Sequence, residues 1–247
     1  LEERRVHRDP FRREPLESDT PPTLTGEQST AVTTVQASLG SYESFLLLGV
    51  TGSGKTEVYL HLIDAVLARG EGALVLVPEI ALTPQLVARF RARLGSQIAV
   101  LHSALDPGAR HEQWLRIAAG ELSVVIGARS AVFAPIPNLG LVVVDEEHDG
   151  SFKQDTSPRY HGRDLALMRG HNERCPVLLG TATPSLESWA NVSRSKMTLL
   201  RLSERVADRP MPEVRLLDLR AQSFMDPERI FSRDLVEEIQ TNLTRGE

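Results

Sequence analysis

Six short runs of apolar residues between positions 45 and 180 constrain the fold of this chain more than any other feature. Each run lacks the alternation of polar and apolar positions that marks a strand with one face in water. Uninterrupted runs of this length are typical of strands buried on both faces, as in a parallel sheet. The runs are FLLLG, ALVLV, IAVLH, SVVIG, LVVVD and PVLLG, at residues 45–49, 73–77, 98–102, 123–127, 141–145 and 176–180.

Helix-like stretches separate these apolar runs. Repetition of strand and helix predicts an α/β domain with three layers, in which a mostly parallel central sheet lies between two layers of helices. Thr25 and Gln28 have the spacing of a capping box, so we expect a further helix to begin there. Residues 197–202 and 213–219 form two later apolar stretches, and residues 232–244 are expected to form a helix. The helix-like stretches between the runs are 55–69, 84–94, 108–119 and 162–172.

Composition limits the class of protein. Of the 247 residues, 41% are hydrophobic, which is enough to build a core and excludes disorder throughout. The formal charge of −5 provides no global positive field for nucleic acid, so any such contact must be local. A single cysteine, Cys175, excludes a disulfide framework and fits a reducing, cytoplasmic compartment. No apolar run approaches the ~18 residues of a membrane span.

The two ends of the chain differ from its centre. Residues 1–23 combine charges of both signs with four prolines, so they bury too little apolar surface to order alone. We therefore predict a linker at 1–23, the α/β domain at 24–205 and a connecting segment at 206–247. The first residue is Leu rather than Met, so we expect the chain to be a fragment of a longer protein.

A phosphate-binding motif of the form GxxxxGK[ST] lies between the first predicted strand and the helix after it. Its glycines let the backbone curl until several N–H groups point at phosphate oxygens, and the helix N-terminus adds a favourable dipole. Lys55 is expected to reach the β- and γ-phosphates of ATP, and the Thr56 hydroxyl to ligate Mg²⁺. A glycine-rich turn with an exposed lysine is the alternative. The predicted nucleotide-binding residues are Gly49, Val50, Thr51, Gly52, Ser53, Gly54, Lys55 and Thr56.

Four residues in the order DEEH follow the apolar run at 141–144. Asp145 is expected to hold Mg²⁺, partly through water, and Glu146 to orient and deprotonate the attacking water. Glu147 lies beside them with a less defined role, and His148 is expected between the nucleotide site and the next motif. An acidic loop after a core strand is the alternative. The predicted catalytic residues are Lys55, Asp145, Glu146 and His148.

The segment GTATPS at 180–185 ends another apolar run. The hydroxyls of Thr181 and Thr183 are expected to hydrogen-bond the acidic group and to transmit its state. Pro184 is expected near the first position of a following helix. On its own, this segment is only weakly specific for any class of protein.

In this order and spacing, the three motifs resemble the first RecA-like lobe of a superfamily 2 helicase, near the DEAH-type members. The longer segments resemble the replication-restart helicases in particular, and the resemblance covers about residues 24–220. It thus identifies 24–205 as RecA-like lobe 1. The matching segments are GVTGSGKTEVYL (49–60), LVPEIALTPQL (76–86), LHSAL (101–105), GARSAVFAP (127–135), VVDEEHDGSFKQ (143–154), PRYHGRDLALMR (158–169) and GTATPSLES (180–188).

This resemblance implies an ATP-dependent DNA helicase that uses Mg²⁺, moves 3′→5′ and acts on forked, branched DNA in replication restart. It implies primosome and single-strand-binding proteins as partners, no membrane association and a cytoplasmic, nucleoid-associated location. Gln28 resembles the glutamine that reads the adenine edge, a task that suits a side-chain amide. The alternative for Gln28 is a polar residue in the first helical turn.

The resemblance also implies where DNA binds. Residues 78–85 and 127–129 resemble segments that touch the DNA backbone, for which arginine and hydroxyl side chains are suitable donors. Residues 149–160 resemble an aromatic-rich loop that couples DNA contact to ATP hydrolysis, with aromatic rings to stack on bases and cations to contact phosphates. A mobile surface loop is the alternative. The predicted DNA-contacting residues are Pro78, Arg129, Ser130, Phe152, Lys153, Arg159 and Tyr160.

Parts of the helicase family have no counterpart in this sequence. The family has an upstream DNA-binding region with a winged helix, a second RecA-like lobe with an arginine finger, and a zinc module whose ligands do not include Cys175. We therefore expect the 247-residue chain alone to bind nucleotide weakly and to hydrolyse ATP slowly. Another superfamily 2 translocase and a fork-binding scaffold without ATP hydrolysis are the rival functions. PEIALTPQL and DEEHDGSFKQ argue against the first, and the intact residues 54–56 and 145–146 argue against the second.

Overall fold

The computed structural model describes residues 20–103, 105–206, 216–218 and 231–245. Most of the predicted linker at 1–23 lies outside these residues. So does most of the apolar stretch at 213–219, and its described part, 216–218, forms no strand. The chain divides into two compact units, Leu1–Asp208 and Arg209–Glu247.

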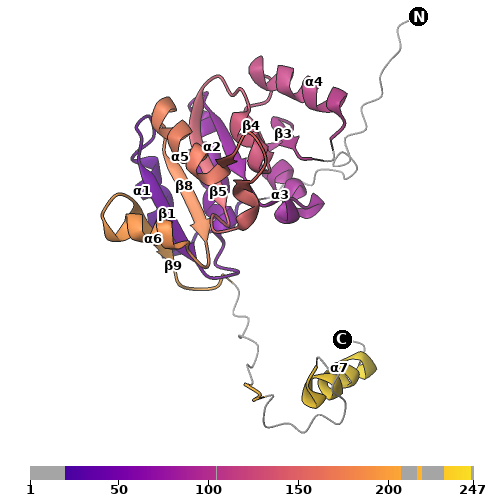
Figure 1. Ribbon diagram of the computed structural model, residues 1–247. Helices are drawn as coiled ribbons and strands as arrows, with labels where there is room; N and C mark the ends of the chain where they lie inside the picture. Colours follow the sequence, from indigo (N-terminus) through magenta and orange to yellow (C-terminus); the bar gives the residue numbers. More distant parts are fainter. Residues whose placement is uncertain (1–19, 104, 207–215, 219–230, 246–247) are drawn as a thin grey trace, which may run out of the picture. The chain divides into compact units, whose positions relative to one another are not determined.

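The first unit is built on one seven-stranded sheet in which every strand pairing is parallel (Figure 1). The six apolar runs and the stretch at 197–202 each supply one strand, which confirms the predicted three-layer α/β fold with its mostly parallel sheet. The strand order is β3-β4-β2-β5-β8-β1-β9. The strands are β1 Ser44–Gly49, β2 Gly72–Leu76, β3 Ile98–Leu101, β4 Val124–Gly127, β5 Leu139–Asp145, β8 Val177–Thr181 and β9 Thr198–Leu202.

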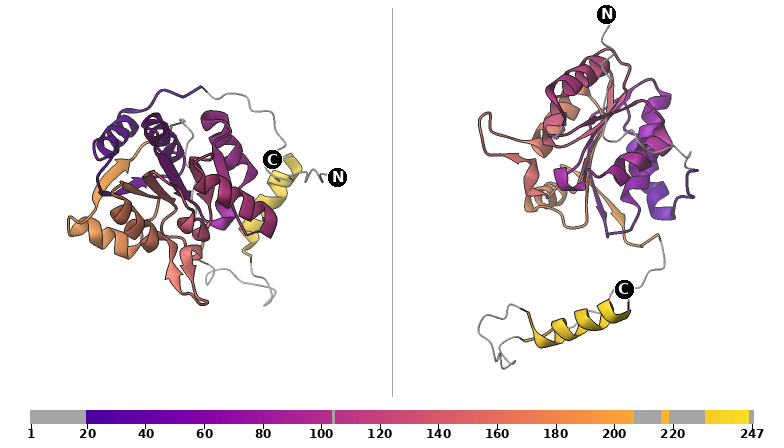
Figure 2. Two further views of the ribbon diagram at one scale, coloured as in Figure 1. Left: turned by 90° about the horizontal axis from the view of Figure 1, so that it is seen from above. Right: turned by 90° about the vertical axis from the view of Figure 1, so that its right-hand side faces the viewer.

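Helices cover both faces of this sheet (Figure 2). The first three helices pack on one face, and the next three on the other. The capping box is present at the start of α1, where Thr25 and Gln28 exchange side-chain hydrogen bonds with each other's backbone N–H. The helices of this unit are α1 Gly26–Gln36, α2 Lys55–Ala68, α3 Pro84–Leu94, α4 Pro107–Ala118, α5 Gly162–Glu173 and α6 Leu186–Ser193.

Shorter elements occupy the connections. A two-stranded antiparallel hairpin precedes α5, and its strands pair Lys153 with His161 and Gln154 with Tyr160. Short 3₁₀ turns follow or precede several strands. These elements are η1 Glu79–Ala81, η2 Arg129–Phe133, η3 Gly150–Phe152, β6 Lys153–Gln154 and β7 Tyr160–His161.

The core consists of two apolar clusters, one on each face of the sheet. Because successive side chains of a strand point to opposite faces, Leu47 of β1 joins the cluster under α1–α3, while Leu46 joins the cluster under α4–α6. Both side chains are fully buried. Burial of each such leucine stabilises the fold by about 1.5–3 kcal/mol. Burial on both faces explains why these runs are continuous in the sequence.

The strand order brings the sequence motifs to one edge of the sheet. The phosphate-binding motif follows β1, the DEEH segment ends β5, and β8 lies between these two strands. The register places Gly180 of β8 level with Asp145 on one side and with Leu47 on the other. In open parallel sheets ligands bind outside the carboxyl ends of the strands, so this edge is the expected site.

The second unit contains the helix α7 Arg233–Arg245, which confirms the helix expected at 232–244. Its apolar side chains Leu235, Val236, Ile239 and Leu243 are all exposed. Among the described residues, no helix has both the length and the apolar character to cross a membrane.

Candidate nucleotide-binding site

The phosphate-binding loop adopts a compact conformation that depends on its glycines. Gly52 and Gly54 have φ of 83° and 81°, the left-handed region that favours glycine. A Cβ at Gly49 would lie 2.5 Å from the Ser53 hydroxyl oxygen, so the close approach needs glycine there also. Ser53 Oγ is buried without a hydrogen-bond partner among the described residues, although its backbone N–H donates to the Val50 carbonyl. The loop thus has both the conformation and an unused polar atom suited to an anionic ligand.

Lys55 joins the phosphate-binding loop to the acidic segment. It is the first residue of α2, and its Nζ donates to the carbonyl oxygen of Gly49 over 3.0 Å. The same Nζ lies 3.6 Å from Oε1 of Glu146. The two motifs therefore meet at one place, as the sequence analysis expected. Thr56, the second residue of α2, is partly buried beside them.

Asp145 is partly buried at the end of β5 and is held by a tyrosine from α2. The hydroxyl of Tyr59 donates a 2.8 Å hydrogen bond to Asp145 Oδ1. Burial raises the pKa of Asp145, and the charge of Glu146 raises it further, while the Tyr59 hydrogen bond and Lys55 lower it. Burial also raises the pKa of the Tyr59 phenol well above its usual value. The sequence analysis missed Tyr59, although its position four residues after Lys55 places it on the same helix face.

Gly180 leaves room for the Tyr59 hydroxyl. A Cβ at Gly180 would lie 1.7 Å from Tyr59 Oη and 3.3 Å from Asp145 Oδ1. The end of β8 therefore has to be glycine if Tyr59 is to reach across it to Asp145.

His148 contacts two threonines at and just after the end of β8. Its Nδ1 lies 2.8 Å from Thr181 Oγ1, and its Nε2 lies 3.3 Å from Thr183 Oγ1. Its Nδ1 is also 3.7 Å from Glu146 Oε2. The threonines were expected to bond the acidic group, but their side-chain partner is His148. Pro184 precedes the cap of α6 at Ser185, rather than occupying the first helical position.

Gln28 lies directly against the phosphate-binding loop. Its Oε1 accepts from the Thr25 backbone N–H at 2.9 Å, and its Nε2 donates to the Ser53 carbonyl at 2.8 Å. A Cβ at Gly54 would lie 2.4 Å from Gln28 Nε2. These contacts give Gln28 a structural role in α1 and in the loop. Because an amide has a second lone pair and a second N–H, recognition of adenine stays a prediction for Gln28.

Arg129, predicted to contact DNA, also holds the segment at 149–160. Its Nη1 donates to the backbone carbonyls of Ser151, at 3.0 Å, and of Lys153. Its guanidinium carbon lies 5.8 Å from the ring centroid of Tyr160. The neighbouring Ser130 is exposed.

Two of the residues predicted to contact DNA have buried side chains in this structure. Phe152 is fully buried within the core, so its ring offers no face to a base. Pro78 is buried two residues after the end of β2, where it precedes η1, and its contact with a DNA backbone stays a prediction. Lys153 and Arg159 are exposed, and both contact Asp155: Lys153 Nζ lies 3.2 Å from its carboxylate, and Arg159 Nε donates to its carbonyl at 3.1 Å.

A buried ionic cluster joins α2 to α3, and the sequence analysis did not find it. Glu57 follows the phosphate-binding motif, and only 4% of its side chain is exposed. It accepts hydrogen bonds from Arg93 and, at 3.2 Å, from Arg89, while His61 Nε2 lies 3.4 Å away. Glu57 and Arg93 are 36 positions apart, so helix periodicity gave no sign of the pairing.

Glu147 forms a second buried group that the sequence analysis left without a defined role. It is fully buried, and its carboxylate accepts four hydrogen bonds, from Arg163, Ser185 and Ser188. The spacing of Arg163 and Glu147 in the sequence does not predict that they pair. The available signal was weaker: two adjoining motifs contain an arginine and a carboxylate.

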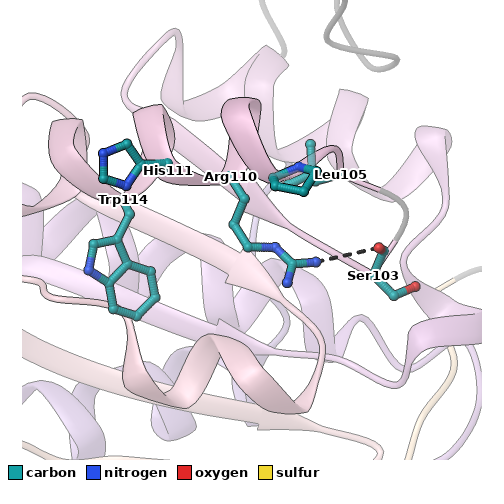
Figure 3. Close-up of a pocket in the computed structure, with 6 residues that line it drawn as sticks. Ser103, Leu105, Arg110, His111 and Trp114 are labelled. Atoms are coloured by element: carbon teal, nitrogen blue, oxygen red, sulfur yellow. Dashed lines mark hydrogen bonds between the residues drawn. The ribbon is translucent and has the colours of Figure 1, made fainter.

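A separate surface hollow of about 670 Å³ lies beside α4 (Figure 3). In Figure 3, Arg110 reaches toward Ser103, and its Nη2 donates to the carbonyls of His102 and Ser103 at 3.0 and 3.4 Å. This hollow contains no residue of the phosphate-binding loop or of the DEEH segment. Its lining residues are Ser103, Leu105, Pro107, Arg110, His111 and Trp114.

The parallel sheet, the glycine-rich loop and the carboxylates beside it define a RecA-like P-loop protein. Residues 25–192 match the family described as DEAD/DEAH box helicase, so the chain belongs to that family. Membership implies the general use of ATP and Mg²⁺. Among the described residues, no group of three or more His, Cys, Asp or Glu side chains is placed to hold a metal ion.

Within this family, the chain is similar to the replication restart protein PriA. It is 47% identical to PriA of Bacillus subtilis over 244 residues, which are 98% of this chain and 30% of that protein. It is 49% identical to PriA of Synechocystis sp. over 230 residues, which are 91% of this chain and 28% of that protein. The resemblance to replication-restart helicases is therefore confirmed. The chain spans about 30% of the length of these relatives.

A solved structure of RecG bound to a three-way DNA junction shares the fold. The match has a TM-score of 0.60 and 22% sequence identity, and covers 92% of this chain and 29% of the RecG chain. At this identity the likeness confirms the RecA-like fold.

Proposed function

We propose that this chain is the first RecA-like lobe of an ATP-dependent 3′→5′ DNA helicase that restarts stalled replication forks. The observation that carries the proposal is the convergence of Lys55 and Glu146, whose charged atoms lie 3.6 Å apart. A phosphate-binding loop and a catalytic carboxylate have to meet in this way for phosphoryl transfer to water. Similarity to PriA proteins over nearly the whole chain supports the replication-restart role.

The residues of the site fit ATP and Mg²⁺. We assign the phosphates to Lys55 and to the backbone amides at the start of α2, because the first N–H groups of a helix lack intrahelical partners. Thr56 and Asp145 would ligate Mg²⁺, which supplies charge neutralisation at the phosphates when bound. Glu146 orients and deprotonates the attacking water. His148 lies between Glu146 and Thr181 at the end of β8, a position from which it could transmit changes in either.

The polymer substrate in this proposal is branched, fork-like DNA. Arg129, Ser130, Lys153, Arg159 and Tyr160 are the candidate contacts. The first four supply donors for phosphates, and Tyr160 supplies a ring for a base. Other primosome proteins and single-strand-binding proteins are the proposed partners. The proposed location is the cytoplasm, in association with the nucleoid.

We also propose a role for each part of the chain. Residues 1–23 act as the linker from an upstream DNA-binding region, 24–205 as lobe 1, and 206–247 as the connection toward a second lobe. That lobe would carry the arginine finger, and the zinc module would lie in the same further part of the protein. In helicases of this kind the second lobe contacts the other side of the bound nucleotide. Without those contacts, the 247-residue chain alone should bind ATP weakly and hydrolyse it slowly.

The test compares the full-length protein with its Lys55→Ala variant. We expect the wild type to hydrolyse ATP faster with forked DNA and to unwind the fork 3′→5′. The variant should bind the fork but lose unwinding. Lys196→Ala is the matched control, because Lys196 is exposed before the amino end of β9, away from the loop. Normal unwinding by Lys55→Ala would contradict the proposal.

Fork-binding and ATPase assays on the same full-length protein distinguish the rival functions. A replication-restart helicase should prefer forks whose leading-strand 3′ end lies at the branch, whereas another superfamily 2 translocase should not. A fork-binding scaffold should bind the fork equally with and without ATP, and its ATP hydrolysis should not respond to DNA.

A further inference from the structure

Glu147 connects three segments of the first unit through its buried carboxylate. Its Oε1 accepts from the Ser185 backbone N–H at 2.7 Å, at the N-terminus of α6. Its Oε2 accepts from the hydroxyls of Ser185 and Ser188, at 2.9 and 2.8 Å, and from Arg163 Nη1 at 3.0 Å. Arg163 belongs to α5, so one side chain joins the end of β5 to the beginnings of α5 and α6.

The side chains of the adjacent residues Glu146 and Glu147 point in different directions. Glu146 has φ of 46°, in the left-handed region that non-glycine residues seldom adopt. As a result the Glu146 side chain meets Lys55, while the Glu147 side chain enters the core. Because the two residues share a peptide unit, a shift of the Glu147 carboxylate changes the position of Glu146.

Arg163 is the second residue of α5, two positions after the segment at 149–161. Its Nη1 donates to Glu147 and, at 2.7 Å, to Ser185 Oγ, while its Nε donates to the exposed Asp164 at 2.9 Å. That segment carries exposed cations at its surface and returns to the core at β7, immediately before α5. A force on the segment therefore reaches Arg163 through the first turn of α5.

We propose that Glu147 is a positioning residue that couples contact at residues 149–161 to the orientation of Glu146, with Arg163 as the connecting group. The coupling rests on the proposed function, a DNA-stimulated ATPase. It is distinct from the contact of His148 with Thr181 and Thr183, because it runs to α5 rather than to the loop after β8.

A purely structural role for Glu147 makes a different prediction. If the buried pair only stabilised the fold, weakening it would lower thermal stability and would lower ATP hydrolysis with and without DNA in parallel. A coupling role predicts that DNA stimulation falls while basal hydrolysis is kept, because the Glu147–Arg163 pair transmits a shift only when the segment is contacted, and Lys55 and Glu146 are themselves not substituted.

The test uses Arg163→Lys and Glu147→Gln in the full-length protein. Lysine keeps the positive charge but is shorter and lacks the guanidinium geometry by which Nη1 of Arg163 reaches both Glu147 and Ser185. Glutamine keeps the size of Glu147 but removes its charge. Asp164→Asn is the matched control, because Asp164 bonds the same guanidinium from the exposed side. The readouts are kcat without DNA, kcat at saturating forked DNA, KM for ATP, half-saturating DNA and the thermal midpoint.

We expect Arg163→Lys and Glu147→Gln to lower the DNA-stimulated kcat by about tenfold, with basal kcat and KM for ATP within about twofold of wild type. Asp164→Asn should retain its stimulation. Full stimulation in either folded variant, or a parallel fall of basal and stimulated kcat, would overturn the coupling. Absence of DNA stimulation in the wild type would instead overturn the proposed function. If Glu147→Gln fails to fold, Arg163→Lys decides the question.

Discussion

The hydroxyl of Tyr59 donates a 2.8 Å hydrogen bond to Oδ1 of Asp145, across the end of β8. The raised pKa of the phenol keeps it protonated, so it acts as a fixed donor at neutral pH. One carboxylate oxygen of Asp145 is thereby oriented by the protein. We infer that the other oxygen is the one left for a cation.

Tyr59→Phe should move the acid limb of the pH–rate profile for ATP hydrolysis to higher pH. The tyrosine hydrogen bond lowers the pKa of Asp145, so its removal raises that pKa. The carboxyl group must be ionised to hold Mg²⁺, and in the variant it protonates at a higher pH. The measurement is kcat/KM against pH at saturating Mg²⁺. Tyr42→Phe is the control, since Tyr42 is 38% exposed and packs on His171. A limb that stays in place, or moves to lower pH, would refute this assignment.

Gly180→Ala should destabilise the first unit by about 1–3 kcal/mol, the usual cost of overpacking. The added Cβ would lie 1.7 Å from Tyr59 Oη and 2.9 Å from Cζ. Tyr59→Phe in the same chain should recover part of the loss, because it removes the first clash but not the second. Chemical denaturation of both single variants and the double variant gives the coupling. Gly150→Ala is the control, since nothing lies within 4 Å of its added Cβ. Strictly additive effects would show that the two residues do not compete for space.

Glu57→Gln should destabilise the fold by about 3 kcal/mol, because Arg93 stays buried and loses its nearest carboxylate, while the Asp64 carboxylate remains 3.9 Å away. Glu121→Gln should cost at most about 1 kcal/mol, since its pair with Arg116 is exposed. The free energies of unfolding come from denaturant titrations of the first unit. Equal losses in both variants would mean that burial does not distinguish the two pairs.

Cys175 should react slowly with thiol reagents in the folded protein. It is 1% exposed, and burial raises the pKa of its thiol to about 12. Thiolate is the reactive form, so alkylation should remain slow up to about pH 9, where an ordinary thiol is largely ionised. Denaturant should restore the normal rate. The chain has one cysteine, so the alkylated mass reports this site alone. Rapid native-state alkylation would show that the site opens locally.

The strands and most helices could be predicted because their signals are local. In a run such as Phe45–Gly49, adjacent apolar residues are enough to indicate a buried strand. Thr25 and Gln28 form their helix cap within one turn. The phosphate-binding loop is equally local. Convergence of Lys55 with Glu146 followed from one rule, that the carboxyl ends of parallel strands share an edge.

The remaining features depend on contacts between distant positions. Tyr59 reaches Asp145 over 86 positions, and Ser188 reaches Glu147 over 41. Neither pairing leaves a periodic pattern in the sequence. Phe152 was misassigned for a related reason: an aromatic ring in a charged loop can face bases or the core, and its neighbours in space decide which.

The left-handed residue at Glu146 makes the acidic segment sensitive to reading-frame-preserving insertions and deletions. The Glu146 side chain faces Lys55, whereas the Glu147 side chain is buried in the core. Deletion of one residue at 145–148 would therefore place an acid that faces outward where an acid that faces inward is needed. The exposed tip at 155–159 carries no such alternation. Variation in chain length among natural sequences should therefore occur at that tip and be absent from residues 145–148.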